Sequence, residues 1–258
     1  MKYTIEEAKL LKKEQLAKGI FRFTVFSPAV ASVAKAGQFA NISVAGKILR
    51  RPISICELDP QFGRIRFVFE VRGDGTAILS QAVEGDIIDL IAPLGHGFDL
   101  GDPSLQAVFV GGGIGVPPLL EAAKSYGRNA SVYLGFRSEE AMILVRDFAV
   151  RGAAVRIATD DGSLGYHGFV TDLLKEKLQN DHVDIIYACG PRPMLKLIAA
   201  MAREQGVACQ VSLEERMGCG IGACLVCACP ILKDGVPTYR HVCKEGPVFN
   251  AEEVVWDA

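Results

Sequence analysis

The sequence lacks an excess of charge of either sign. Lysine and arginine together number 28 and aspartate and glutamate 30, so the formal net charge is −2 at neutral pH. Proteins that bind the phosphate backbone of nucleic acids usually carry a basic surface, and this balance argues against dedicated nucleic-acid binding. Half of the residues are hydrophobic and 22% are charged, which is enough apolar material for large cores and excludes disorder as the main state.

Long apolar segments are also missing. Residues 1–13 contain no apolar run of the length that marks a secretory signal. The most apolar stretch, residues 107–123, contains four glycines and two prolines together with Glu121, and Lys124 follows it. It is therefore not a membrane span of about 20 residues. We expect a cytosolic protein that does not associate with a membrane.

What the sequence has in quantity is cysteine. Three of the eight cysteines, Cys56, Cys189 and Cys209, are scattered, whereas the other five lie close together. In a reducing compartment, cysteines serve more often as metal ligands, catalytic groups or small core residues than as disulfides. The cluster therefore predicts a metal site. Its members are Cys219, Cys224, Cys227, Cys229 and Cys243.

The spacing within the cluster indicates the kind of metal site. Cys219, Cys224 and Cys227 follow a C-x4-C-x2-C pattern, and Cys243 returns from a later segment. This arrangement is typical of plant-type [2Fe–2S] sites, and the glycines between the cysteines let the backbone approach the inorganic sulfides. The alternative is a tetrahedral zinc site on Cys224 and Cys227, completed by Cys219, Cys243 or His241. Zinc sites usually show two separated cysteine pairs, which favours the iron–sulfur interpretation.

Hydrophobic patterns divide the chain at about residue 100. Before it, short alternating segments separated by glycine turns predict an antiparallel β-barrel with one short helix. Beyond it, apolar runs alternate with helical periods, which predicts a parallel sheet covered by helices. The expected barrel strands are 20–26, 38–44, 64–71 and 86–92, with the helix at 76–83. The expected later strands are 106–110, 132–135, 155–159, 185–189 and 209–213, with helices from 117, near 139–150, and at 170–178 and 193–204.

We therefore predict an α+β multidomain chain with three domains. Residues 1–100 would form a β-barrel flavin domain, residues 101–212 a parallel α/β nucleotide-binding domain, and residues 213–258 a small [2Fe–2S] domain. The last part is too small to be stable through hydrophobic burial alone, so the metal cluster is expected to stabilise it.

Two segments of the barrel half carry groups that suit a flavin nucleotide. In Arg50-Arg51-Pro-Ile-Ser54, a guanidinium group can bind a pyrophosphate through two hydrogen bonds, and the serine three residues later can reach a flavin ring edge. In Gly73-Asp-Gly75-Thr76, a glycine turn leads into the predicted helix and offers free N–H groups to a second phosphate. Either segment alone would equally suit a surface turn.

The second half carries a glycine-rich turn between a strand and a helix. Gly111, Gly112, Gly113 and Gly115 permit close approach of a dinucleotide, although Pro118 stands near the place of the last glycine of the usual motif. Another strand ends in Cys189-Gly190-Pro191 at the same carboxyl edge of the sheet, where ligands of open α/β sheets bind. Cys189 either faces a nicotinamide there or is a small buried thiol.

The segments R-P-I-S, G-G-G-x-G-x-x-P and C-G-P-x-x-M, in this order, resemble the ferredoxin–NADP reductase superfamily. With the cysteine-rich tail, the chain is similar to the electron-transfer subunits of NAD-linked dihydroorotate dehydrogenase B. The similarity covers nearly the whole chain and is sharpest in Met217–Cys224. It implies that [2Fe–2S] ligation falls to Cys219, Cys224, Cys227 and Cys243. It implies that FAD is held by Arg51, Pro52, Ile53, Ser54, Val68, Phe69, Glu70, Gly75 and Thr76. The expected NAD contacts are Gly111, Gly112, Gly113, Gly115, Cys189, Gly190 and Pro191.

The resemblance also implies a partner and a direction of electron flow. A catalytic subunit carrying FMN would oxidise dihydroorotate to orotate in pyrimidine biosynthesis, in a heterotetramer of two plus two subunits. Electrons would pass through the cluster to FAD and then, as hydride, to NAD. A cluster moves one electron at a time, so the second flavin would collect the pair that hydride transfer requires. The cluster tail would face the partner.

The histidines are consistent with a chain that transfers electrons and leaves dihydroorotate oxidation to the partner. None stands in a constellation typical of acid–base catalysis, so the chain alone should react with NADH but should not oxidise dihydroorotate. The four are His96, His167, His182 and His241.

Other interpretations share part of this pattern. Small subunits of NADH-dependent ferredoxin:NADP oxidoreductases, sulfide dehydrogenases and anaerobic sulfite reductases resemble it, but the first two tend to replace one cluster cysteine with aspartate. A zinc-bearing binding module without redox chemistry is the alternative from a different class. Arg137 could accept the 2′-phosphate of NADP while Glu139 would repel it, so the preference for NAD depends on the resemblance. No role is assigned to Cys56, Cys209 and Cys229.

Overall fold

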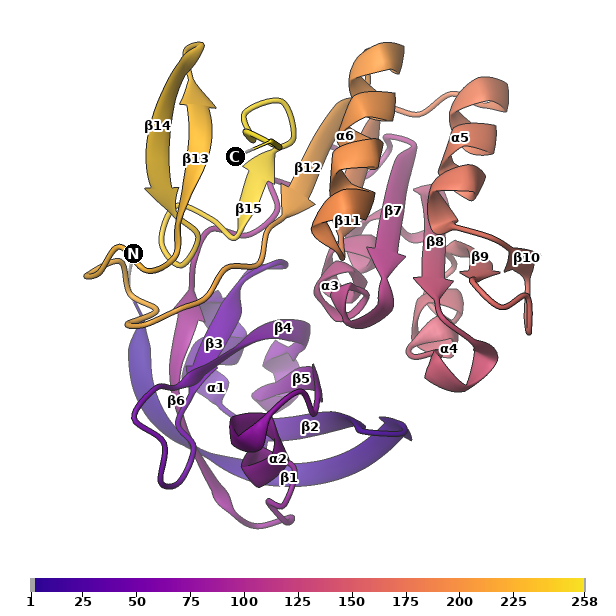
Figure 1. The fold of residues 1–258 in the computed structure, drawn as a ribbon. Coiled ribbons are helices and arrows are strands. Elements are labelled where there is room, and N and C mark those ends of the chain that lie inside the picture. The colour runs from indigo at the N-terminus through magenta and orange to yellow at the C-terminus, as the bar shows by residue number, and fades with distance from the viewer. Residues whose placement is uncertain (1–2, 258) are drawn as a thin grey trace.

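The computed structural model describes residues 3–257. The N-terminal part is a closed six-stranded barrel in the order β1-β2-β5-β4-β3-β6, with antiparallel pairing throughout (Figure 1). Its strands are β1 (Thr4–Ala17), β2 (Ile20–Phe26), β3 (Phe39–Ile42), β4 (Arg51–Asp59), β5 (Arg64–Glu70) and β6 (Ile87–Leu94). Two short helices, α1 (Pro28–Val33) and α2 (Asp74–Leu79), and the 3₁₀ turn η1 (Pro60–Phe62) join them.

Alternation of side chains explains the barrel. On β5, Ile65, Phe67 and Phe69 are buried in the barrel core, whereas the charged residues Arg64, Arg66 and Glu70 are only half-buried. β1 was not predicted as a strand, because only Ala8 and Leu10 are buried among many charged residues. β4 is likewise absent from the strands predicted from the sequence. The predicted helix at 76–83 is instead α2, which begins and ends earlier.

The second part is a seven-stranded sheet in the order β10-β9-β8-β7-β11-β12-β15. All neighbours pair in parallel except β12 and β15, which are antiparallel. Its strands are β7 (Ala107–Gly112), β8 (Ala130–Phe136), β9 (Ala154–Thr159), β10 (Tyr166–His167), β11 (Ile185–Cys189), β12 (Ala208–Ser212) and β15 (Val248–Asn250). Its helices are α3 (Pro117–Tyr126), α4 (Val145–Ala149), α5 (Val170–Asn180) and α6 (Arg192–Gln205), with the 3₁₀ turns η2 (Gly113–Gly115), η3 (Gly127–Asn129) and η4 (Glu139–Ala141).

Helices cover both faces of this sheet, as the alternation of apolar and helical segments predicted. On β7, Val108 packs in the same core as α5 and α6, whereas Phe109 packs in the core that contains α3 and α4. The predicted fold class is confirmed. The helix expected near 139–150 is divided into η4 and α4, because Leu144 adopts a left-handed φ of 61°.

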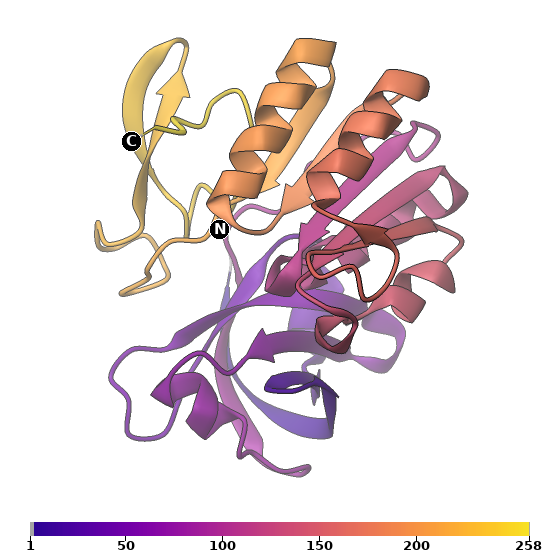
Figure 2. The same ribbon diagram turned by 45° about the vertical axis from the view of Figure 1, so that its right-hand side comes forward.

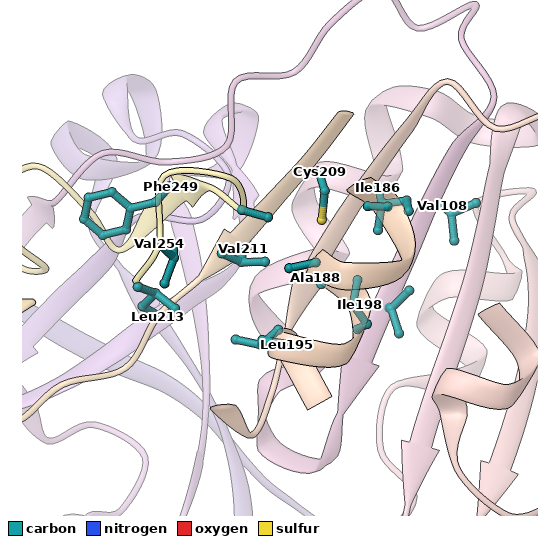
Figure 3. Packing of buried hydrophobic residues seen from close by; sticks show 14 of the residues in the cluster. Val108, Ile186, Ala188, Leu195, Ile198, Cys209, Val211, Leu213, Phe249 and Val254 are labelled. Carbon is teal, nitrogen blue, oxygen red and sulfur yellow. The ribbon is translucent and has the colours of Figure 1, made fainter. Parts of the chain in front are cut away.

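The cysteine-rich tail forms the hairpin of β13 (Ala228–Lys233) and β14 (Val236–His241) and then returns to the sheet as β15. Figure 3 shows that Phe249 and Val254 of the tail pack beside Val211 and Leu213, in a core that continues beneath α6. A shared core and a shared sheet thus attach the tail to the α/β part, and they contribute stability in addition to any metal. The boundaries at residues 100 and 212 stay predictions.

The three parts meet along one side of the barrel. In Figures 1 and 2 the hairpin β13–β14 lies at the edge of the α/β part, and the loop that precedes it lies next to the barrel. Within residues 3–257, no helix is both long enough and apolar enough to cross a membrane.

Candidate functional site

A cavity of about 1670 Å³ lies where the barrel meets the carboxyl edge of the parallel sheet. Ordinary small-molecule pockets measure roughly 300–1,000 Å³, so this cavity is larger than one small ligand needs. Every residue predicted to contact FAD lines it, and so does every residue predicted to contact NAD except Gly111. The fold therefore brings together two sets of residues that are far apart in the sequence.

The two neighbouring arginines of β4 and the loop before it have different tasks. Arg50 is bound on both nitrogens by the Asp89 carboxylate, at 2.8 and 3.0 Å, and donates to the carbonyl of Asn41 at 3.3 Å. Arg51 lines the cavity and donates to the carbonyl of Leu49, and within residues 3–257 no carboxylate lies within ion-pair distance of it. Arg51 is therefore the arginine whose charge is available to an anionic ligand.

The start of α2 is built to approach Arg51. A Cβ atom at Gly75 would collide with the Arg51 guanidinium group, so only glycine allows this contact. The Thr76 hydroxyl accepts a hydrogen bond from the N–H of Arg72 at 2.9 Å and donates to the carbonyl of Gly73 at 3.1 Å, which fixes the turn. A cationic side chain and a glycine turn thus lie next to each other on the cavity wall, as pyrophosphate binding requires.

Glycines shape the opposite wall in two ways. A Cβ atom at Gly115 would lie 2.5 Å from the carbonyl oxygen of Cys189, so glycine lets the turns after β7 and β11 pack together. Gly113 has a left-handed φ of 53° and no atom within 4 Å of its Cβ position, which leaves the space in front of it free for a ligand. Gly111 lies outside the lining, and its Cβ position is 2.8 Å from Val116 Cγ2.

Cys189 lines the cavity at the end of β11. Burial raises the pKa of its thiol to about 12, although a hydrogen bond with Ser212 opposes the rise. The thiol is therefore neutral at physiological pH, and it can contact a neutral ring as a small polarisable group but not as a thiolate. Both sequence interpretations of Cys189 are compatible with this position, since the residue is half-buried and also lines the cavity.

The end of the cavity near β8 and β9 carries charged groups of both signs. Arg137, Glu140 and Asp160 line it. Glu139 lies outside the lining, and its N–H donates to Ser163 Oγ at 2.7 Å. Glu140 and Asp160 were not predicted as site residues. A signal existed for Asp160, because it directly follows a strand of the parallel sheet at the edge where ligands bind.

The cluster loop, residues 218–227, directs backbone N–H groups at sulfur atoms. Cys219 Sγ accepts from the N–H of Ala223 at 3.3 Å, and Cys243 Sγ accepts from that of Gly222 at 3.1 Å. The φ angles of Gly220 and Gly222 are 72° and 81°, in the left-handed region that glycine adopts without strain. Such donors stabilise a metal-bound thiolate, so the loop suits the predicted cluster.

The pKa values of two ligands follow from this environment. Burial raises the pKa of Cys219, but hydrogen bonds from the N–H of Ile221 and from Cys224 outweigh it and lower the pKa to about 6. Burial, followed by the neighbouring Cys227, raises the pKa of Cys243 to about 12. Cys219 is therefore readily deprotonated, as a metal ligand must be, whereas Cys243 loses its proton only when a metal replaces it.

The four predicted ligands lie in two pairs. Cys224 lowers the pKa of Cys219, and Cys227 raises the pKa of Cys243, so the two members of each pair are neighbours. In the described part of the chain, no three histidine, cysteine, aspartate or glutamate side chains are grouped closely enough to hold one metal ion. Structural zinc requires four ligands around one point, whereas a [2Fe–2S] cluster spreads its four thiolates over two irons. The C-x4-C-x2-C spacing of three of the four cysteines favours the cluster over zinc.

His241 is not part of this ligand arrangement. Its backbone N–H donates to Glu245 Oε2 at 2.8 Å, and its ring nitrogen Nδ1 lies 3.4 Å from the same carboxylate oxygen. The three cysteines without an assigned role are buried, and burial raises the pKa of Cys209 to about 12 and that of Cys229 to about 11. Cys56, Cys209 and Cys229 thus behave as small core residues.

The segment between β12 and the cluster loop was not predicted to contribute to the site. Residues 212–217 line the cavity and lead directly to Cys219. Phe39 of β3 lines it as well and belongs to the same core as Cys227 and Cys243. The cluster loop is therefore adjacent to the wall of the flavin cavity, a proximity that no local pattern in the sequence indicates.

Comparisons with known proteins agree with this geometry. Residues 214–255 match the family described as the iron-sulfur cluster binding domain of dihydroorotate dehydrogenase B. Over 97% of its length, the chain is 42% identical to the dihydroorotate dehydrogenase B (NAD(+)) electron transfer subunit of Geobacillus thermodenitrificans, of which it covers 98%. The corresponding subunit of Desulforamulus reducens is 39% identical with the same coverage.

Solved structures extend the comparison to the fold. A structure of an NADH-dependent reduced ferredoxin-NADP oxidoreductase matches with a TM-score of 0.87 and 33% identity, covering 98% of this chain and 91% of that one. The cytochrome b5 reductase domain of Ulva prolifera nitrate reductase shares the fold alone, with a TM-score of 0.65 and 17% identity over 79% of this chain and 94% of that one.

The barrel, the glycine-lined edge and the paired cysteines define a reductase of the ferredoxin–NADP reductase type with an added iron–sulfur domain. More narrowly, the chain belongs to the family of dihydroorotate dehydrogenase B electron transfer subunits. The resemblance inferred from the sequence is thereby confirmed, and the non-redox zinc module is not supported.

Proposed function

We propose that the chain carries electrons between a [2Fe–2S] cluster, FAD and NAD+ as the electron transfer subunit of an NAD-linked dihydroorotate dehydrogenase in pyrimidine biosynthesis. The observation that supports this most directly is the composition of one cavity. Its wall combines the Arg51–Ser54 segment, the glycine edge, and residues 212–217, which lead to the cluster ligands. FAD supplies the means to exchange two electrons as hydride on one side and single electrons on the other.

The barrel side of the cavity would hold FAD. Arg51 and the turn at Gly75 and Thr76 offer a guanidinium group and free N–H groups to the pyrophosphate. Ser54 lies opposite Phe39 in the β3–β4 register, and both line the cavity, where they can contact the ring system. The remaining proposed contacts are Pro52, Ile53, Val68, Phe69 and Glu70.

The sheet side would hold NAD. The cavity-lining glycines after β7 and β11 permit close approach of the nucleotide to the backbone, and Cys189 presents a neutral thiol beside it. Glu140 and Asp160 place two carboxylates at the far end against the single guanidinium of Arg137. This balance would repel a 2′-phosphate and favours NAD over NADP. Gly112, Gly113, Gly115, Gly190 and Pro191 complete the proposed set, and Gly111 would act only by supporting the turn.

The tail would ligate the cluster and face the catalytic subunit. Cys219, Cys224, Cys227 and Cys243 are the proposed ligands. The cluster loop exposes large apolar side chains, since Leu225 is 77% and Val226 57% exposed. Apolar side chains grouped beside a redox centre are typical of a surface that another protein covers. We propose that an FMN-containing subunit binds there, in an assembly of two copies of each chain.

The test compares the activity of the isolated chain with that of the chain combined with the FMN subunit. The chain purified from its native cell without oxygen should contain flavin and iron, and NADH should bleach its flavin. Dihydroorotate should reduce NAD+ only after the FMN subunit is added. A colourless, zinc-containing protein would refute the redox function. A co-purified sulfite-reducing or ferredoxin-dependent partner would instead assign the chain to one of the related small-subunit families.

A further inference from the structure

Asn41 lies on the strand that separates the flavin cavity from the cluster loop. On β3, Ala40 and Ile42 are buried in the barrel core, whereas Phe39 belongs to the core shared with the cluster ligands and lines the cavity. Asn41 is two residues from Phe39, so strand alternation places both on the outer face of the barrel. Asn41 is nevertheless only 1% exposed.

The tail covers Asn41, and the contact is specific. Asn41 Nδ2 donates a hydrogen bond to the carbonyl oxygen of Cys219 at 3.3 Å. A Cβ atom at Gly220 would collide with the same amide group, and Gly220 has a left-handed φ of 72°. The amide thus fits against the one residue type that leaves room for it, directly after the first cluster ligand.

The other side of Asn41 is fixed to the flavin wall. Its backbone carbonyl oxygen accepts a hydrogen bond from Arg50 at 3.3 Å, and the Arg50 guanidinium group is bound by the Asp89 carboxylate. In the β3–β4 register, Asn41 pairs with Pro52, which lines the flavin cavity. A continuous set of contacts therefore runs from the cavity wall through Asn41 to Cys219.

Stability alone does not explain an asparagine at this position. Among residues 3–257, Asn41 Oδ1 is buried and has no hydrogen-bond partner. A buried acceptor without a donor destabilises a folded protein, so a leucine of similar size would remove an unfavourable group. The amide is useful chiefly through the single hydrogen bond that its nitrogen donates to the cluster loop.

We propose that Asn41 is a positioning residue, which holds the Cys219 end of the cluster loop against the flavin wall and so sets the rate of electron exchange between the two cofactors. The inference depends on the proposed function, because it assumes that FAD and the cluster occupy these two places. Asn41 itself would neither bind FAD nor ligate iron.

The experiment compares Asn41→Leu with wild type and with Gln210→Leu in the holoprotein. Gln210 is a matched control, since it is a buried amide on β12 that exchanges hydrogen bonds of 2.8 and 2.9 Å with the Asp99 backbone, away from the cluster loop. NADH is mixed with each protein without oxygen. Flavin bleaching is followed by absorbance, cluster reduction by rapid-freeze electron paramagnetic resonance, and unfolding by calorimetry.

For Asn41→Leu we expect unchanged FAD content, unchanged flavin reduction by NADH, and an unfolding temperature no lower than that of wild type. Cluster reduction should slow by about fivefold. Loss of one ordinary hydrogen bond lowers the equilibrium constant between the docked and the undocked loop by about that factor. The resonance of the dithionite-reduced cluster should broaden. Gln210→Leu should unfold at a lower temperature and keep the wild-type ratio of cluster to flavin reduction.

A wild-type ratio in Asn41→Leu, or the same slowing in Gln210→Leu, would overturn the proposal. If Asn41→Leu does not fold, Gly220→Ala serves instead, because its methyl group displaces the retained Asn41 amide; a wild-type ratio there would overturn the proposal equally. Failure of the proposed function would look different, since wild type itself would then contain no flavin or cluster that NADH reduces.

Discussion

The cluster loop and the flavin wall lie next to each other, yet they are built in opposite ways. Three of the proposed iron ligands come from one short run, Cys219–Cys227, and only Cys243 comes from elsewhere. The cavity beside it collects residues from β4, β5, α2, the turns after β7 and β11, and residues 212–217. Local spacing therefore specifies the metal site, whereas tertiary assembly specifies the cavity. The same difference should govern how each region responds to substitution.

The largest expected effect is in the cluster loop. Cys224→Ser should abolish cluster absorbance and iron content, because the serine oxygen is a poor substitute for one of the paired thiolates. FAD should remain at least partly bound, since its proposed contacts lie on the barrel. Absorbance spectra and iron analysis check this. Simultaneous loss of flavin would show that the two regions are not separable.

Removal of iron should expose a difference between two thiols. At pH 7.5, Cys219 should be alkylated quickly by iodoacetamide because its pKa of about 6 makes it largely a thiolate, whereas Cys189, with a pKa of about 12, should react very slowly. Mass spectrometry of the apoprotein measures both. Lowering the pH below about 6 should slow the Cys219 reaction, since protonation then removes the nucleophile. Equal alkylation rates of Cys219 and Cys189 would contradict the expected difference between their pKa values.

In the flavin wall we expect a smaller and graded effect. Arg51→Ala should weaken FAD binding by about 1.5 to 3 kcal/mol through loss of a charge-assisted contact, and should leave the iron content unchanged. Arg50→Ala is the matched control. It should lower the unfolding temperature, because Asp89 loses its partner, with little change in FAD affinity. Fluorimetric titration with FAD distinguishes the two, and equal affinity losses would refute the assignment of the pyrophosphate to Arg51.

The smallest expected effects concern two glycines of the opposite wall. Gly115→Ala should destabilise the fold by about 1 to 3 kcal/mol, since its methyl group would press on the Cys189 backbone. Gly113→Ala meets no neighbouring atom and should cost only about 1 kcal/mol through its left-handed φ. Its methyl group would enter the cavity, however, so NADH should bind more weakly. Urea unfolding and the KM for NADH separate these effects, and a reversed order of stabilities would contradict the geometry.

Sequence patterns anticipated much of the architecture and failed at identifiable places. Alternating apolar residues predicted β2, β3, β5 and β6, and short apolar runs predicted the parallel strands β7, β8, β9, β11 and β12, because these patterns lie within each strand's own residues. The two-residue parallel strand β10 (Tyr166–His167) was not predicted. The patterns also missed β1, where burial is confined to Ala8 and Leu10, and β15, which is only three residues long. Both are strands because a neighbour pairs with them, and pairing partners are not encoded locally.

The sequence by itself determined the spacing of the four cysteines, the glycines of the cluster loop and the order of the flavin and nucleotide motifs, because these properties are covalent and local. The resemblance had singled out Arg51, but only the tertiary structure gives the physical reason: Arg51 lines the cavity, whereas Asp89 neutralises Arg50. Only the tertiary structure joined Asn41 to Cys219 across the interface between barrel and tail. Such contacts join residues far apart in the chain, and long-range packing alone decides which of them meet.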